Sequence, residues 1–136
     1  MPSKLATMPQ DKLYFTWSHI METVARLASQ LPPDAKLWGI PRNGTIISGL
    51  LAHQRDDLRL HPFEPQGMLS GDPKTIVIID DIYDTGRTLK PYMEQGFQVA
   101  TLFYRNHVPR ETTDRPHFWA SCVKTEHWLV FPWEKK

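Results

Sequence analysis

Residues 75–89 read Thr-Ile-Val-Ile-Ile-Asp-Asp-Ile-Tyr-Asp-Thr-Gly-Arg-Thr-Leu. The first five side chains form a β-branched, apolar run, which is typical of a strand buried on both faces of a parallel sheet. We expect this strand to end where two adjacent carboxylates, Asp80 and Asp81, begin. Carboxylates are costly to bury without partners, and open α/β sheets bind ligands at the carboxyl ends of their strands. The pair is therefore expected to face a ligand.

The five residues at 84–88, Asp-Thr-Gly-Arg-Thr, predict a site for an anion. Gly permits a tight turn, backbone amides can converge there, and hydroxyls lie just where we expect a helix to begin, at Thr88. An acidic pair that suits a polyol, next to a loop that suits a phosphate, indicates a sugar phosphate. The alternative is an ordinary strand–turn–helix junction in which Asp84 caps a helix, but capping gives Asp80 and Asp81 no role.

This stretch resembles the phosphoribosyl-pyrophosphate (PRPP) signature of the type I phosphoribosyltransferases. That signature is an apolar strand, two acidic residues, two variable residues and then Asp-Thr-Gly-x-Thr. The resemblance implies that Asp80 and Asp81 hold the ribose 2′ and 3′ hydroxyls and act on Mg²⁺ mostly through water. It implies that the 5′-phosphate is cradled by Asp84, Thr85, Gly86, Arg87 and Thr88.

A second strand–turn–helix pattern lies at residues 36–51. Residues 36–40 read as a strand, Pro-Arg-Asn-Gly follows, and a helix with one apolar face continues to Leu51. This geometry also presents backbone amides to an anion, and Arg42 adds a fixed positive charge. An alternative is a hairpin-like turn with an exposed Arg.

Residues 14–18 and 38–52 resemble the bacterial xanthine-guanine members of the same family. This resemblance implies that Arg42, Asn43 and Gly44 bind pyrophosphate. Asn43 departs from the family's usual Gly. Asn tolerates left-handed backbone geometry better than most residues, so we expect the turn to survive.

Two residues near the end of the chain are implied to contact a base. Arg105 follows an expected strand at 98–104, where purine-using members carry a Lys that contacts the base's O6; a solvated loop Arg is the alternative. The segment 127–134 resembles the family's closing Trp-x-x-x-Pro-Trp-acidic pattern, which makes Trp128 the stacking platform. Trp133 is expected to pack against the sheet. Val130 stands where xanthine-guanine enzymes carry an acidic residue, so recognition of a purine 2-substituent by that side chain is not expected.

The remaining elements complete a doubly wound α/β domain, type I phosphoribosyltransferase-like, with a mostly parallel sheet of four or five strands. A helix is expected after Ser18, as N-cap, until Pro32. Another helix should carry Pro91 in its first turn and end before Gly96. A last strand is expected at 118–123. Residues 1–11 read as an extended arm and residues 106–116 as an exposed loop.

The middle segment, residues 53–74, reads as loop with a possible short strand at 58–63. It is too short for the flexible hood that the family normally places there. We therefore expect a reduced hood, with the reacting sugar either covered by a neighbouring subunit or left partly wet. A homodimer or higher homo-oligomer is the expected assembly.

Composition excludes several classes of function. The 136 residues suit one domain spanning 1–136, and 16 Lys and Arg against 15 Asp and Glu give no basic field for nucleic acid. No apolar run approaches the roughly 18 residues of a membrane span, and the amino terminus lacks a secretory core. The single Cys122 excludes an intramolecular disulfide, and no His pair has metal-ligand spacing. A cytoplasmic protein with a small-molecule ligand is expected.

The reaction that the resemblance implies is the Mg²⁺-dependent transfer of a 5-phosphoribosyl group from PRPP to a purine-like base, releasing pyrophosphate, as in purine salvage. Asp84 is the candidate for moving a proton at the base nitrogen, a role that requires a pKa raised by burial or by neighbouring carboxylates. Two alternatives remain: hydrolysis of a nucleotide's N-glycosidic bond, and non-catalytic binding of PRPP or a nucleotide as a regulator.

Overall fold

The computed structural model describes residues 11–62, 69–105, 114–124 and 126–134. In these residues, five strands form one sheet in the order β3-β2-β4-β5-β6, and every neighbouring pair is parallel. The strands are β2 (Lys36–Gly39), β3 (Arg59–Leu60), β4 (Ile76–Tyr83), β5 (Gln98–Tyr104) and β6 (Phe118–Cys122). The predicted fold class is confirmed.

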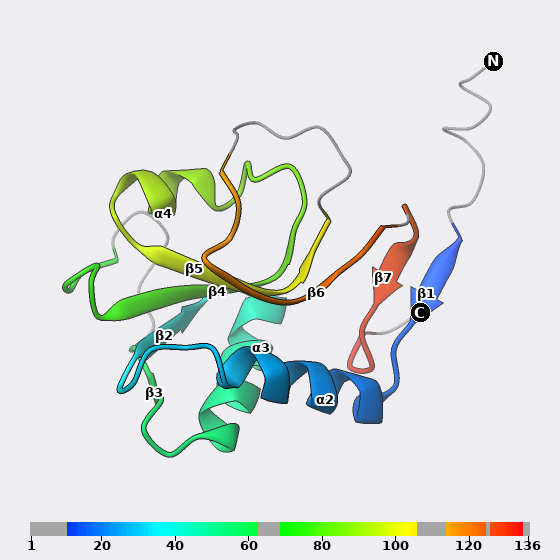
Figure 1. Cartoon of the computed structure of the whole chain (residues 1–136), viewed down its shortest axis with the longest axis horizontal. Coiled ribbons are helices and arrows are strands. Elements are labelled where there is room, and N and C mark those ends of the chain that lie inside the picture. Colours follow the sequence, from blue (N-terminus) through cyan, green and yellow to red (C-terminus); the bar gives the residue numbers. More distant parts are fainter. Residues whose placement is uncertain (1–10, 63–68, 106–113, 125, 135–136) are drawn as a thin grey trace.

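Helices cover both faces of this sheet. The helices α2 (Trp17–Ala28) and α3 (Asn43–Gln54) lie on one face, and the short helix α4 (Lys90–Glu94) lies on the other (Figure 1). The side chains of β4 alternate accordingly: Val77 and Ile79 join the core beneath α2 and α3, whereas Ile76 and Ile78 join the core beneath α4. This two-sided burial explains why the strand is apolar at every position rather than at alternate ones.

A second, two-stranded sheet joins the two ends of the described chain. The strands β1 (Lys12–Tyr14) and β7 (Trp128–Val130) pair in parallel, beside the main sheet (Figure 1). Directly after β1, Phe15 stacks on Phe103 of β5 with ring centroids 4.8 Å apart, which anchors the small sheet to the core. Sequence periodicity did not predict these strands, because each is three residues long and its partner lies over a hundred residues away.

Two strand and helix boundaries differ from the predictions. The strand β4 does not stop before Asp80 but continues to Tyr83, because Asp80, Ile82 and Tyr83 still pair with β5. The N-cap of α2 is Thr16 rather than Ser18, since the Thr16 hydroxyl accepts a hydrogen bond from the His19 N–H at 3.0 Å. Pairing with β5 thus decides where β4 ends, and a local hydrogen bond to Thr16 decides where α2 begins.

The helix α4 begins at Lys90 rather than Thr88, with Pro91 in its first turn as predicted. It ends before Gly96, whose φ of +97° is the left-handed geometry expected just after a helix end. The predicted arm and exposed loop fall largely on residues 1–10 and 106–113, outside the described part of the chain. None of the described helices is long and apolar enough to cross a membrane.

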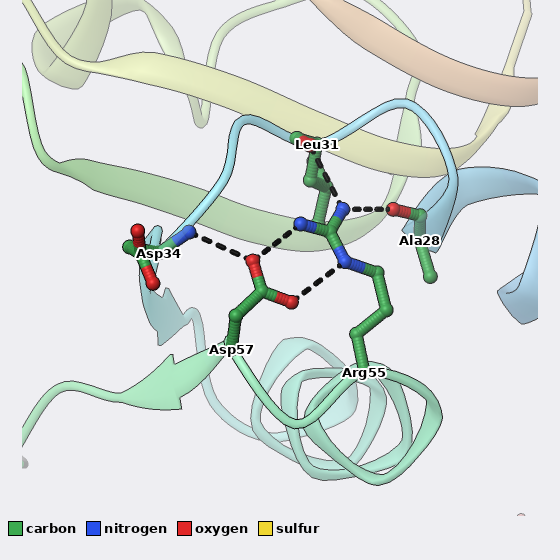
Figure 2. Close-up of polar contacts among 5 residues, drawn as sticks. All are labelled: Ala28, Leu31, Asp34, Arg55 and Asp57. Atoms are coloured by element: carbon green, nitrogen blue, oxygen red, sulfur yellow. Dashed lines mark hydrogen bonds and ion pairs between the residues drawn. The ribbon is translucent and has the colours of Figure 1, made fainter.

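The side chain of Arg55 binds the carboxyl end of α2, which lies away from the β1–β7 sheet (Figure 1). Arg55, just after α3, donates from Nη1 to the carbonyls of Ala28 and Leu31 at 2.7 and 2.8 Å (Figure 2). Its Nε also donates to Asp57 at 2.9 Å. Hydrogen bonds from Arg55 and from the Asp34 backbone lower the pKa of Asp57 to about 2. Arg55 therefore gives a charged hydrogen-bond donor to the carbonyl of Ala28, the last residue of α2, and to that of Leu31, just beyond the helix.

We predict that Arg55→Ala destabilises the domain by about 1–2 kcal/mol, because those carbonyls lose their charged donor. Arg55→Lys should recover part of the loss, since a single ammonium cannot reproduce the planar fork. Thermal denaturation measures both effects. Arg59→Ala, at an exposed position on β3, is the matched control, and an equal loss in this control would refute a specific role for Arg55.

Candidate functional site

The acidic pair lies inside the last half of β4, at the carboxyl end of the sheet. The backbone N–H of Asp81 donates to Asp80 Oδ1 at 2.9 Å, and the N–H of Ile82 donates to Asp81 Oδ1 at 2.8 Å. Successive strand residues point to opposite faces. The two carboxylates nevertheless share a cavity: Asp80 and Asp81 both line one, and Asp81 also lines a second.

Burial and the neighbouring charge of Asp81 raise the pKa of Asp80 from its usual 3.8 to about 8. A carboxyl with that pKa holds its proton at neutral pH until a ligand or cation favours the charged form. The sequence identified the pair but not this asymmetry, which arises from the depth of one side chain in the fold.

The anion loop predicted at residues 84–88 encloses a cavity of about 170 Å³ that is lined by residues 80–89. Gly86 has a φ of +90°, and a Cβ there would lie 2.7 Å from the Tyr83 hydroxyl, so the turn requires glycine on both grounds. The Thr85 hydroxyl accepts a hydrogen bond from the Arg87 N–H at 3.3 Å. All five residues predicted to bind phosphate therefore line one small cavity, which Asp80 and Asp81 also line.

A larger cavity, of about 550 Å³, lies between the end of β4 and the segment that carries β7. Trp128 lines it and is 64% exposed, a flat apolar face available to a ligand. Arg105 is 7% exposed; its Nη2 donates to the His127 carbonyl at 3.2 Å, and its Nε lies 3.7 Å from Asp84 Oδ1. The aromatic face of Trp128 and the charged pair of Arg105 and Asp84 thus line one cavity.

Asp84 is less buried than its predicted role requires. Its side chain is 50% exposed and lies against the cation of Arg105. The burial that the predicted proton-transfer role of Asp84 requires is found instead at Asp80.

The turn that follows β2 lies next to the acidic pair. A third cavity, of about 490 Å³, is lined by Arg42 and Asn43 of this turn and by Lys12 and Trp128 of the small sheet. The peptide bond between Pro41 and Arg42 is cis. Gly44 is buried, and a Cβ on it would lie 2.3 Å from the Ile79 carbonyl, so this glycine permits backbone contact with β4.

The side chain of Asn43 is used differently from the prediction. Asn43 belongs to α3 and does not have the left-handed geometry that was the expected reason for Asn. Its Nδ2 instead donates to Asp81 and to Glu134, both at 3.0 Å, and its Oδ1 accepts from Trp133 Nε1 at 2.9 Å. Trp133 also stacks on Phe131, as expected for a packing role. Glu134 was not among the predicted site residues, although it occupies the acidic position of the closing pattern at residues 127–134.

The structure therefore brings every predicted site residue to one edge of the sheet. The three cavities share residues: Asp81 and Asp84 line both the 170 Å³ and the 550 Å³ cavities, and Trp128 lines both the 550 Å³ and the 490 Å³ cavities.

Comparison with known proteins yields no matching family model. The xanthine-guanine phosphoribosyltransferase of Cereibacter sphaeroides is 26% identical over 157 aligned positions, covering 93% of this chain and 90% of that protein. The crystal structure of a purine phosphoribosyltransferase from Pyrococcus horikoshii matches with a TM-score of 0.69 and 30% identity, covering 93% of this chain and 96% of that one. The Helicobacter pylori xanthine-guanine-hypoxanthine enzyme, 17% identical with a TM-score of 0.67 over 89% and 92% of the chains, shares the fold.

The parallel sheet, with an acidic pair and a glycine turn at its carboxyl edge, matches the fold of these phosphoribosyltransferases. The chain belongs to the type I phosphoribosyltransferase family, and the relatives reported above are purine phosphoribosyltransferases. Its 136 residues are consistent with the predicted reduction of the hood.

The raised pKa of Asp80 leads to a prediction about stability. The pKa is higher in the folded than in the unfolded chain, so this group contributes most to folding below pH 4, and the contribution is lost as pH rises toward about 8. Asp80→Asn removes the ionisation and keeps an acceptor for the Asp81 N–H. We therefore expect the variant to melt higher than the wild type at pH 8 and equally at pH 4.

For a domain of this size, each kcal/mol relieved raises the melting midpoint by roughly 4 °C. Asp56→Asn, at an exposed position, is the control and should show no such pH-dependent gain. A midpoint for Asp80→Asn that follows the wild type at both pH values would contradict the assignment.

Proposed function

We propose that this protein transfers a 5-phosphoribosyl group from PRPP to a purine-like base and releases pyrophosphate. The observation that carries the proposal is the gathering of four recognition elements around Asp81: an acidic pair, an anion loop, an Arg-Asn-Gly turn and an exposed Trp face, in contiguous cavities. A sugar carrying a 5′-phosphate, a pyrophosphate and an adjacent base requires this combination. The similarity to purine phosphoribosyltransferases supports the same substrate class.

The proposed roles follow from position. Asp80 and Asp81 hold the ribose hydroxyls, and residues 84–88 hold the 5′-phosphate in the small cavity that they line. Arg42, Asn43 and Gly44 hold pyrophosphate at the start of α3, where helical N–H groups are available to an anion. Departure of pyrophosphate builds positive charge on the sugar ring, which the carboxylates at the end of β4 stabilise.

The base is proposed to lie on Trp128, with Arg105 donating to a carbonyl on its edge. Arg105 is held by the His127 carbonyl and by Asp84, so its planar group has a defined orientation. Val130 is 6% exposed and packs inward, which supports the expectation that it does not recognise a purine 2-substituent. A base seated on Trp128 would also cover Asp84, which supplies the burial needed for proton exchange at the base nitrogen.

Mg²⁺ is the metal that this family of reactions implies, and the residues fit it. In the described residues no group of three or more His, Cys, Asp or Glu side chains could hold a metal by itself. Two carboxylates at the end of β4 suit a cation that keeps several waters and is shared with substrate phosphates. When bound, the ion would neutralise pyrophosphate charge; Asp80 and Asp81 would orient its water shell.

Hydrolysis of a nucleotide's N-glycosidic bond is the second candidate. Trp128 is 64% exposed and Asp84 is half-exposed, so water reaches the position proposed for the base. Closure by a second copy of the chain would suppress this side reaction. Both outcomes are distinguished by product analysis.

We predict nucleotide formation when the protein is incubated with Mg²⁺, PRPP and a panel of purine bases. Parallel incubations with PRPP alone and with nucleoside monophosphates measure ribose 5-phosphate, which reports hydrolysis. They are run across a series of protein concentrations, with molecular size measured alongside.

Asp80→Asn with Asp81→Asn should abolish Mg²⁺-dependent PRPP binding in a folded protein, because the pair lies at the sheet edge. Unchanged PRPP affinity by calorimetry in this variant would remove the proposal.

We predict that Trp128→Ala weakens base binding several-fold or more, because stacking contributes roughly 0.5–1.5 kcal/mol beyond burial. PRPP affinity should stay close to the wild-type value, and Trp128→Phe should recover part of the base affinity. Trp17→Ala, which removes an indole that is 50% exposed and in contact with Trp133, is the control. Equal losses for PRPP and base in Trp128→Ala would indicate a structural role instead.

A further inference from the structure

Asn43 connects three parts of the chain through one amide group. It lies at the start of α3, in the turn proposed for pyrophosphate. Both N–H groups of Nδ2 are used, one for Asp81 at the end of β4 and one for Glu134 beyond β7. Its carbonyl oxygen accepts from the Trp133 indole. The amide therefore meets the acidic pair and the closing segment at once.

The closing segment, residues 131–134 after β7, is a turn held by its own hydrogen bonds and by one ring contact. Glu134 Oε1 accepts from the Phe131 N–H at 2.9 Å, and the Glu134 N–H donates to the Phe131 carbonyl at 3.0 Å. Trp133 stacks on Phe131 with ring centroids 5.0 Å apart and planes 11° apart. The turn follows directly from β7, so its position and that of Trp128 are linked.

An amide is well suited to this junction, and glycine is not. Asp81 and Glu134 present two carboxylates to the same nitrogen, at 3.0 Å each. Without a hydrogen-bond donor between them, these two negatively charged carboxylates would repel each other. A carboxylate at position 43 would add a third negative charge. Only a neutral group with two N–H donors and one acceptor satisfies all three partners.

We infer that Asn43 is a positioning residue that couples the pyrophosphate and base subsites. Pyrophosphate on the turn would fix the first residues of α3, and the amide would then hold the turn of residues 131–134, with Trp128, in place for the base. Ordering that the first ligand has already caused need not be repeated for the second. Each ligand therefore raises the affinity for the other by the same factor. The inference rests on the proposed function.

The test uses hypoxanthine and inorganic pyrophosphate with Mg²⁺, which do not react with each other because neither carries a ribose. Calorimetry gives the Kd of hypoxanthine with and without saturating pyrophosphate, and the ratio of the two is the coupling. We expect a ratio of about 5 or more in the wild type. Asn43→Gly should bring it close to 1. Trp133→Phe, which keeps an aromatic ring and removes the indole N–H, should lower it partly.

Thr45→Ala is the matched control, because Thr45 lies in the same turn of α3 but its hydroxyl donates to the Gly39 carbonyl. This control should keep the wild-type ratio. A wild-type ratio in both Asn43→Gly and Trp133→Phe would overturn the inference while leaving the proposed transfer intact. A wild-type protein that binds neither ligand and forms no nucleotide would remove the proposed function, and the coupling with it.

Discussion

The close contact between the first turn of α3 and the strand β4 determines how the site is assembled. A Cβ on Gly44 would lie 2.3 Å from the Ile79 carbonyl, and one on Gly39 would lie 2.1 Å from the Gly44 carbonyl. Side chains at either position would push the helix off the sheet. Because they are absent, α3 begins against the backbone of β4, and Asn43 reaches Asp81, two residues beyond Ile79.

The carboxylates of the site differ in whether a nearby donor or cation stabilises their negative charge. Asp81 and Glu134 share the amide of Asn43, and Asp84 faces Arg105, but Asp80 is buried beside Asp81 and its pKa rises to about 8. Folding places this carboxyl where the charged form is disfavoured. Such a position is typical of a group whose preferred partner is a ligand, and it is retained at some expense of stability.

The cover of the site comes from the ends of the chain. The middle segment, residues 53–74, contributes only the last two residues of α3 and the two-residue strand β3 to regular structure in its described part. The strands β1 and β7 instead pair beside the carboxyl edge of the main sheet, and Trp128 and Lys12 of this small sheet line the cavities. A short chain can therefore carry a reduced hood and still enclose part of its site.

The sequence by itself determined the elements with strong local signals. The apolar run before Asp80, the glycine turn at Gly86 and the helix-ending Gly96 follow from side-chain burial and backbone geometry within a few residues. These signals, with the resemblance of residues 75–89 to the PRPP signature, were enough for the fold class and for the choice of candidate site residues.

Only the tertiary structure decided what depends on distant partners. The continuation of β4 to Tyr83 follows from pairing with β5, and the β1–β7 sheet joins residues over a hundred positions apart. For Asn43 the sequence favoured a local reason, left-handed backbone geometry, which the residue does not have; its side chain instead binds Asp81 and Glu134, which are 38 and 91 residues away. The raised pKa of Asp80 likewise depends on burial, which is a property of the packed fold and of no short stretch of sequence.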